Sequence, residues 1–509
     1  MNFSGVTYTK SELSPATLRL LITIAIMLVT VMEVLDMTIV NVSLPPMMGS
    51  LGASSDQITW VLTSYIVCAA IVMPLTGFLV KNLGRKKLLL INIFGFLVAS
   101  ILCGVAISLP EMVLFRSLQG IFGASLVPLS QYIIREIYTK EEQGKAMAIW
   151  GMGVMVAPIL GPTLGGYITE NFNWRWVFYI NVPVSLLAFF LCWQLIEETP
   201  IEKTKLDRIG LITMVLGIGC LQMMLDRGVT DDWFSSNLIC FLTLIAGTCL
   251  TIFVYRGFTQ NNTLINLRLF LDRNFGICSL LILLYCAQTI GLISIQPFML
   301  EHVMGYTSGV TGAIMAPRGI TSAISMAFIA KLGNRFDPRI CLITGVMIAM
   351  IGSHLMSTYS LSASPAFIMF TSSIQGLGMG LFFVPLSTIA FTTLHPKQIA
   401  EASGLFSFNR SLGCSIGIST LMTILSHEKQ LNWHRLIGHI RNTNPNFDYW
   451  LQHTPFLNSD NPAIYSHLHY LIAQHSTMIA FLDIYWAGTL SLLLMIPFIL
   501  LLKPSVTIK

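Results

Sequence analysis

The sequence predicts an all-α membrane protein with fourteen transmembrane helices. Only 10% of its 509 residues are charged and 54% are hydrophobic, whereas a water-soluble protein usually carries about a quarter charged residues. Apolar runs of about 20 residues, the length that crosses the hydrocarbon core of a bilayer, recur almost from end to end. Helices are expected because backbone groups in lipid must be hydrogen-bonded within their own segment. The alternating pattern of a membrane β-barrel is absent from the sequence.

Short polar segments separate the apolar runs. The fourteen predicted spans are 17–43, 57–79, 87–108, 111–137, 144–169, 175–196, 208–226, 236–256, 274–300, 306–331, 338–358, 364–394, 398–426 and 479–503.

The basic residues predict how the chain is oriented in the membrane. With a cytoplasmic N-terminus, 21 of the 29 Lys and Arg residues lie in cytoplasmic segments, as the positive-inside tendency requires. The reverse orientation would place those 21 outside. The basic residues therefore indicate topology and not a nucleic-acid surface, and both termini are expected in the cytoplasm.

The cysteines and the N-terminus exclude several other classes. All ten cysteines fall within apolar runs and none forms a CxxC motif, so neither a metal site nor a disulfide framework is expected. The first apolar run is about 27 residues long and holds two carboxylates, which indicates a retained span and not a cleaved signal peptide.

Weak internal repetition predicts two related halves, as in many transporters. SLQG at 117–120 and VPLS at 127–130 are echoed by SIQG at 373–376 and VPLS at 384–387. These pairs match span 4 to span 12. Two six-helix halves of the same orientation are then expected, with two spans inserted between them.

The predicted organisation follows from this repeat. It comprises a cytoplasmic segment at 1–16, an N-terminal half at 17–197, an inserted two-helix linker at 198–273, a C-terminal half at 274–503 with an outer loop at 427–478, and a cytoplasmic tail at 504–509.

The outer loop at 427–478 is polar and holds seven of the ten histidines. Scattered histidines can form a metal site or a pH sensor. Their irregular spacing favours the simpler interpretation, in which they are solvated loop residues.

An ordered set of motifs resembles a known family. These motifs are LDMTIVNVSLP at 35–45, LFRSLQG at 114–120, APILGPTLGG at 157–166, WVFYINVP at 176–183, LDRG at 225–228 and DWFSS at 232–236. Together they are similar to the motifs of the fourteen-span drug:proton antiporters of the major facilitator superfamily, and are closest to those of its EmrB exporters. The resemblance covers essentially the whole chain.

This resemblance implies the major facilitator fold and a function. The chain is expected to export amphipathic or lipophilic compounds in exchange for protons by alternating access, with the proton gradient as energy source and no cofactor. It implies residence in the bacterial inner membrane, and as partners a periplasmic adaptor protein and an outer-membrane channel. The loop at 427–478 is the expected docking site for the adaptor.

One motif departs from the superfamily pattern. The loop between spans 2 and 3 carries Lys81 where the superfamily usually has an aspartate. That aspartate is expected to pair with a cytoplasmic helix end, so the usual charged latch is in doubt in this chain.

Two carboxylates in span 1 are the strongest candidates for proton coupling. Glu33 and Asp36 are three residues apart and therefore share a helix face. An ionised carboxylate is costly to bury, and intramembrane carboxylates are usually functional. We expect Asp36 to bind and release the coupling proton, with Glu33 as an auxiliary proton site or a cation anchor. The alternative is a static polar contact between helices.

Other polar residues within spans extend this site. Arg116 in span 4 keeps its proton, so it must face a carboxylate or a water-filled cavity, and we expect it to stabilise the carboxylate when the proton leaves. Gln119, one turn further on, can bridge Arg116 to substrate or water. Asp483, just inside the last span, is a weaker candidate for a second titrating group.

The span-5 motif contains Pro158, Gly161, Pro162, Gly165 and Gly166. Small residues let helices approach closely, and prolines remove backbone hydrogen bonds and bend a helix. We expect a tight, kinked seam between the two halves that gates transport. Simple helix packing is the alternative.

Polar residues in the C-terminal half are candidates for binding substrate. Tyr285, Gln288 and Gln296 lie in span 9, where polar groups require a cavity. Arg410 in span 13 resembles an arginine at the matching place in these exporters. Arg318 in span 10 has no such support and is expected to extend toward a membrane interface.

Two other functions remain open on the sequence. A dedicated metabolite or siderophore transporter would share the fold and the antiporter-like motif. A receptor or membrane enzyme is disfavoured because no nucleophile–base pair, phosphate loop or metal motif is present.

Overall fold

The computed structural model describes most of the chain, and every regular element in the described part is helical. The described residues are 14–139, 142–202, 206–260, 263–332, 337–440, 447, 449 and 462–503. The tail expected at 504–509 and all but the end of the segment expected at 1–16 lie outside them.

The N-terminal half is a bundle of long helices joined by short ones. It contains α1 (Pro15–Leu51), α2 (Ser55–Ile58), α3 (Trp60–Val72), η1 (Met73–Leu75), α4 (Thr76–Leu83), α5 (Arg85–Val105), α6 (Leu109–Gly123), α7 (Leu126–Ile137), α8 (Gln143–Asn171), α9 (Trp176–Tyr179) and α10 (Asn181–Leu195). Ser14 begins α1 by accepting a hydrogen bond from the backbone of Thr17, as an N-cap serine does.

The inserted pair and the C-terminal half follow. The inserted pair is α11 (Arg208–Arg227) and α12 (Asn237–Thr259), joined by η3 (Trp233–Ser235). The C-terminal half contains η4 (Leu267–Leu271), α13 (Arg273–Phe298), η5 (Met299–Val303), α14 (Ser308–Leu332), α15 (Pro338–Met356), α16 (Pro365–Ile389), η6 (Pro396–Gln398), α17 (Ile399–Gly438), α19 (Pro462–Leu493) and α20 (Ile496–Leu500).

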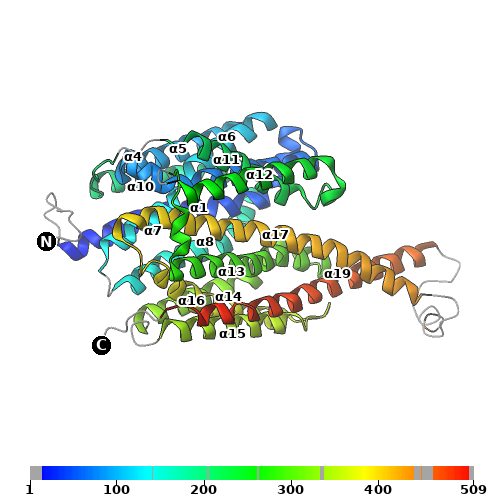
Figure 1. Ribbon diagram of the computed structural model, residues 1–509. Helices are drawn as coiled ribbons and strands as arrows, with labels where there is room; N and C mark the ends of the chain where they lie inside the picture. The colour runs from blue at the N-terminus through cyan, green and yellow to red at the C-terminus, as the bar shows by residue number, and fades with distance from the viewer. Residues whose placement is uncertain are drawn as a thin grey trace.

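The two halves form two adjoining bundles (Figure 1). In the first, α1 packs on α8 and α10, α3 on α6, and α5 on α6. In the second, α13 packs on α17, and α14 and α15 pack on α16. Contacts of α8 with α14 and α16, and of α17 with α7 and α4, join the halves, while α11 of the inserted pair touches both α3 and α17. The predicted two-half architecture with an inserted pair is therefore present.

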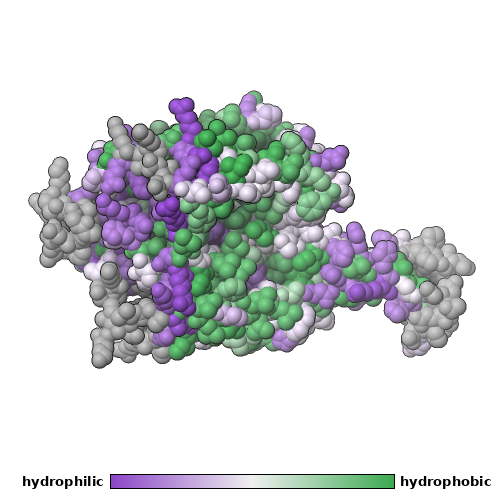
Figure 2. Space-filling model, in the orientation of Figure 1, coloured by the Kyte–Doolittle hydropathy of each residue, from purple (hydrophilic) through white to green (hydrophobic). Residues whose placement is uncertain are grey.

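The surface has a broad apolar belt (Figure 2). Large apolar side chains are exposed along the outer helices, among them Phe94, Leu114, Phe190, Leu244 and Phe328. Polar residues gather at the end where α1 begins and on the helices that project at the other end. A water-soluble protein rarely exposes so extensive an apolar surface, so this belt is the lipid-facing surface of a membrane protein.

The predicted count of fourteen spans is not confirmed, although the all-helical membrane class is. Among the described residues, twelve helices are long and apolar enough to cross a membrane. The helices at the predicted fifth and thirteenth spans, α8 and α17, are 29 and 40 residues long but are not among the twelve. In α17 the reason is composition, because Asn409, Arg410 and several Ser and Gly residues interrupt its apolar sequence.

The prediction of a loop over all of 427–478 is wrong at both ends. α17 continues to Gly438 because neither Gly nor Pro interrupts it after Gly417, and α19 already begins at Pro462. The two helices form a hairpin that projects beyond the bundle (Figure 1). The rings of Trp433 on α17 and His469 on α19 are 4.6 Å apart and join the two helices. His453 lies outside the described residues, and within them no group of three His, Cys, Asp or Glu residues is arranged to hold a metal.

Candidate functional site

Asp36 is the centre of a buried hydrogen-bonded network in the N-terminal half. Its side chain on α1 is 0% exposed. Oδ2 lies 2.7 Å from Nη1 of Arg116, and Oδ1 accepts hydrogen bonds from Gln119 Nε2 at 3.0 Å and from Asn181 Nδ2 at 2.7 Å. Three helices, α1, α6 and α10, therefore converge on a single carboxylate. The structure brings together Asp36, Arg116 and Gln119.

Arg116 is enclosed on every side. Its Nε donates to the backbone oxygen of Val61 at 3.2 Å, and Nη1 also donates to Gln119 Oε1 at 2.5 Å. The guanidinium carbon lies 4.4 Å from the centre of the Tyr65 ring, within cation–π range. Removing one partner of a buried ion pair typically costs about 3–5 kcal/mol. Asp36 therefore compensates the charge of Arg116 and makes its burial tolerable.

Glu33 lies beside this network but is poorly satisfied. It is 1% exposed, and its Oε1 accepts a hydrogen bond from the Tyr65 hydroxyl at 3.4 Å. Its Oε2 is buried with no hydrogen-bond partner among the described residues. The positive charge of Arg410, on α17 of the other half, is near enough to act on Glu33 electrostatically. Glu33 is thus the acidic side chain of the site that faces the opposite half.

Sequence reasoning missed three members of this site. Asn181 and Ser100 complete the network, since Asn181 Nδ2 also lies 3.0 Å from Ser100 Oγ. Tyr65 joins Arg116 to Glu33 through its ring and its hydroxyl. The available signal was the same one that indicated Asp36, namely a polar side chain within an apolar span.

The candidates on α13 lie in a separate cluster inside the C-terminal half. Tyr285 stacks on Phe382 with ring centres 4.0 Å apart. Gln288 Nε2 donates to Ser353 at 3.2 Å. Gln296 is fully buried and its Oε1 accepts from Arg318. The structure therefore separates these three residues from the Asp36 network.

The prediction that Arg318 reaches a membrane interface is wrong. Arg318 on α14 is 1% exposed, and its Nη2 lies 2.5 Å from Gln296 Oε1. Nε and Nη1 have no hydrogen-bond partner in the described part of the chain. Arg318 points inward because Gln296 Oε1 on α13 accepts its hydrogen bond, whereas the lipid-facing side has no acceptor for a guanidinium group. Asp483, the weaker candidate in the last span, is exposed and accepts a hydrogen bond from Asn432 at 3.3 Å.

The glycines of the span-5 motif contact α1 of their own half, so the predicted seam between halves is wrong for them. A Cβ on Gly161 would lie 2.8 Å from Thr38 Cβ, and one on Gly165 would lie 2.6 Å from the backbone oxygen of Ile39. Gly166 has only ordinary contacts, with Val42 at 3.8 Å. Glycine is required where two backbones approach this closely. The opposite side of α8 contacts the other half.

The prolines of the motif lie within one continuous helix, α8. Pro158 is half-buried, and the side chain of Pro162 lies outside the described residues.

The C-terminal half repeats the close helix packing. Gly413 and Gly417 on α17 are four residues apart, like Gly161 and Gly165 on α8, and they press on α13. A Cβ on Gly417 would overlap the backbone oxygen of Ala287. The α8–α1 and α17–α13 contacts are thus equivalent contacts in the two halves.

A charged latch joins the halves despite the substitution at position 81. Nζ of Lys81, at the end of α4, lies 3.1 Å from Oε2 of Glu401, at the start of α17. The backbone N–H of Asn266 donates to the other oxygen, Oε1, at 2.5 Å. The latch questioned from the sequence is present with its polarity reversed. Arg135 on α7 also donates to the backbone oxygen of Ser387 on α16 at the same end.

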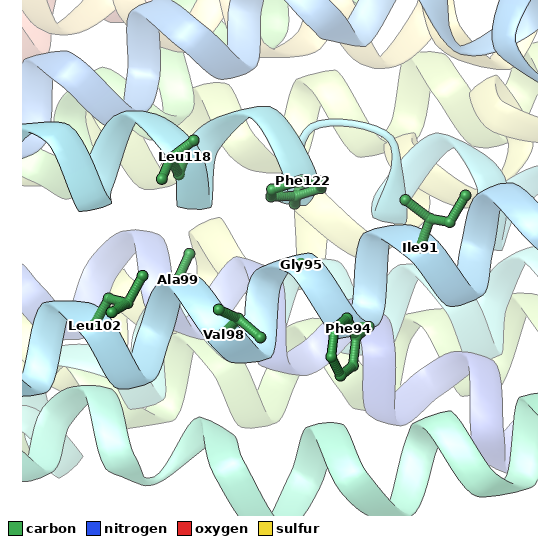
Figure 3. Close-up of a pocket in the computed structure, with 8 residues that line it drawn as sticks. All are labelled: Ile91, Phe94, Gly95, Val98, Ala99, Leu102, Leu118 and Phe122. Atoms are coloured by element: carbon green, nitrogen blue, oxygen red, sulfur yellow. The ribbon is translucent and has the colours of Figure 1, made fainter.

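A surface groove between α5 and α6 is separate from these sites (Figure 3). Its volume is about 280 Å³, and Ile91, Phe94, Val98, Leu118 and Phe122 are among its apolar lining residues. Its lining has no charged or hydrogen-bonding side chain, so it suits the hydrocarbon chain of a lipid and has no part in the chemistry of the Asp36 network.

A helical bundle with an apolar belt, two related halves and buried charges between its spans defines a polytopic membrane transporter. The sequence model of the Major Facilitator Superfamily matches residues 26–418, and the chain belongs to that superfamily. It is therefore a transporter and not an enzyme.

Two relatives and one solved structure illustrate the similarity. The chain is 36% identical to the multidrug export protein EmrB of Haemophilus influenzae over 490 residues, covering 95% of this chain and 96% of that one. It is 34% identical to the fatty acid resistance protein FarB of Neisseria gonorrhoeae over 485 residues, with the same coverage. The human organic anion transporter MFSD10 has the same fold, with a TM-score of 0.60 at 14% identity, covering 93% of this chain and 99% of that one.

Proposed function

We propose that this protein exports amphipathic or lipophilic compounds from the cell in exchange for protons, by alternating access between its two halves. The observation that carries the proposal is the buried Asp36–Arg116 pair with the under-satisfied Glu33 beside it. The names of the relatives, multidrug export for EmrB and fatty acid resistance for FarB, support this class of cargo.

Asp36 is the proposed proton-binding group. When it is ionised, Arg116, Gln119 and Asn181 all donate to it, which stabilises the charge. Protonation removes the charge that Arg116 pairs with, so the two states of Asp36 favour different arrangements of α1 and α6. A proton entering down a membrane potential of 100 mV supplies about 2.3 kcal/mol per charge. No cofactor is required for this cycle.

Glu33 and Arg410 are the proposed link between the proton site and the cargo pathway. They belong to different halves, and each has a buried polar atom without a hydrogen-bond partner among the described residues. A cargo molecule between the halves would meet both side chains. Gln119 belongs to the proton network and is not expected to touch cargo directly.

Proton release on adding cargo tests this proposal. Purified wild-type protein, in detergent with a panel of lipophilic compounds, is expected to release protons, and Asp36→Asn is expected to release none. Asp231→Asn is the matched control, because Asp231 also pairs with an arginine, Arg227, at 3.6 Å, but at a half-exposed position. Release that survives in Asp36→Asn would reject Asp36 as the proton site. Absence of release from the wild type would favour a dedicated metabolite or siderophore transporter.

The projecting hairpin of α17 and α19 is the proposed docking site for a periplasmic adaptor that leads to an outer-membrane channel. This assignment places the protein in the bacterial inner membrane with both termini in the cytoplasm. The polar surface of the hairpin beyond the apolar belt supports it (Figure 2).

A photo-crosslinker tests the docking site. Placed at the exposed Gln430 of the hairpin, it is expected to capture the adaptor in cells, whereas one at the exposed Lys87 of the opposite end is not. Capture from Lys87 alone would contradict both the docking site and the orientation.

A further inference from the structure

We propose that Arg318, Gln296 and Tyr285 bind the anionic headgroup of an amphipathic substrate, most simply a carboxylate. This inference rests on the proposed export function and names the class of compound that the C-terminal half recognises. It is argued from the charge, the unpartnered donors and the apolar surroundings of Arg318.

Arg318 is a buried cation without a counter-ion. It is 1% exposed, and among the described residues no carboxylate forms an ion pair with it. A guanidinium group keeps its charge at any physiological pH, and a buried charge is costly unless an opposite charge accompanies it. A bound anion would supply that missing charge.

Several hydrogen-bond donors of this cluster have no acceptor. Arg318 Nε and Nη1, Gln296 Nε2 and the Tyr285 hydroxyl are all buried without a hydrogen-bond partner in the described part of the chain. Gln296 Oε1 already accepts a hydrogen bond from Arg318 Nη2. Oxygen atoms of an anion accept from several donors at once, and such charge-assisted hydrogen bonds are the strong ones.

The surroundings also fit the apolar part of such a ligand. Tyr285, Tyr359 and Tyr485 lie in the surroundings of Arg318. Tyr359 and Tyr485 belong to a buried apolar cluster of the C-terminal half that also contains Leu292, Met299 and Phe481. Aromatic and methionine side chains beside a few polar groups are typical of pockets for amphipathic ligands.

By the internal repeat, Arg318 corresponds to a residue of the Asp36 network. Gly120 follows Gln119 on α6, and a Cβ there would meet the backbone oxygen of Tyr65. Gly376 is its repeat counterpart on α16, and a Cβ there would meet the backbone oxygen of Arg318. Arg318 therefore occupies the position in the C-terminal half that Tyr65, the neighbour of Arg116 and Glu33, occupies in the N-terminal half.

Arg318 is enclosed in the conformation seen here, so a headgroup reaches it only when the helices around it separate. Alternating access supplies that movement, and for this reason the inference depends on the proposed function.

Equilibrium binding of two matched amphipathic probes to the protein tests the inference. Dodecanoate and dodecyltrimethylammonium share the alkyl chain and differ in headgroup charge. Their Kd values are measured by calorimetry on the purified full-length protein, without a proton gradient. Arg318→Gln is expected to weaken dodecanoate binding at least tenfold and to change dodecyltrimethylammonium binding less than twofold. The control Arg208→Gln removes an exposed arginine and is expected to change neither value.

Several outcomes would overturn the inference. Unchanged dodecanoate binding in Arg318→Gln, or equal weakening of both probes, excludes recognition of the anionic headgroup by Arg318. If Arg318→Gln does not fold, Gln296→Glu places a carboxylate beside Arg318 and should weaken dodecanoate binding; unchanged dodecanoate binding in that variant rejects the site. Headgroup-selective binding without proton release on export would leave this site intact and reject the proton-exchange proposal instead.

Discussion

Arg116, buried in the N-terminal half, is paired with a carboxylate, whereas Arg318, buried in the C-terminal half, is hydrogen-bonded only to an amide. Arg116 lies 2.7 Å from Asp36. Arg318 lies 2.5 Å from the amide oxygen of Gln296, and two of its nitrogens have no partner in the described chain. The Arg116–Asp36 pair has no net charge, whereas Arg318 carries an uncompensated positive charge.

The two halves nevertheless share their packing. The glycine pair at 161 and 165 on α8 presses on α1, and the pair at 413 and 417 on α17 presses on α13. One backbone arrangement therefore carries two kinds of polar site. The difference suits a division of labour in which one half exchanges protons and the other recognises cargo.

Removing the partner of Arg116 or of Arg318 should give the largest losses of stability, and the two losses should differ from each other. Asp36→Ala leaves Arg116 buried without its carboxylate, so we expect the protein to lose about 3–5 kcal/mol of stability. Gln296→Ala removes one neutral acceptor from Arg318, so a loss of about 1–3 kcal/mol is expected. Denaturant unfolding of both purified variants measures the difference. Equal losses would show that the two arginines are balanced in the same way.

The shared packing should respond in parallel in both halves. Gly165→Ala and Gly417→Ala insert a methyl group against a backbone oxygen of the neighbouring helix, and overpacking of this kind costs about 1–3 kcal/mol. Export is expected to fall in both variants because the paired helices can no longer approach. Gly247→Ala on α12 is the control, since nothing lies within 4 Å of its added methyl group. Stability and export are measured together, and a variant of either pair that behaves like Gly247→Ala would disprove the parallel.

Breaking the latch between the halves should give the smallest loss of stability. Lys81 is half-exposed beside the buried Glu401, and ion pairs of this kind contribute about 0.2–1 kcal/mol. Lys81→Glu should weaken the contact between the halves at this end, and the double variant Lys81→Glu with Glu401→Lys should recover part of the loss. A double-mutant cycle in unfolding experiments measures the coupling. Coupling near zero would mean that this ion pair contributes nothing to the contact between the halves at this end.

The fold and part of the site were predictable because both depend on local signals. Apolar run length predicts helices in lipid, and the repeat of SLQG with SIQG predicts two halves. Asp36 and Arg116 were predictable as partners, because each is a charge that lipid cannot accommodate alone.

The errors arose where tertiary contacts decide. The direction in which Arg318 points depends on polar atoms of α13, which the sequence of α14 does not reveal. The face of α8 that its glycines occupy depends on which helix packs there, and Lys81 became part of a latch because Glu401, some 320 positions away, carries the opposite charge. The extent of α17 was underestimated because its polar end was interpreted as a loop although no helix-breaking residue is present.

The length of α17 has a mechanical consequence. It is one continuous helix of 40 residues, with Glu401 of the latch in its first turn and the projecting hairpin at its far end. At 1.5 Å per residue it is about 60 Å long. A tilt of about 10° about its middle would move its two ends about 5 Å in opposite directions. Because α17 is one rigid helix, breaking the Lys81–Glu401 ion pair on one side of the membrane would displace the projecting hairpin on the other side.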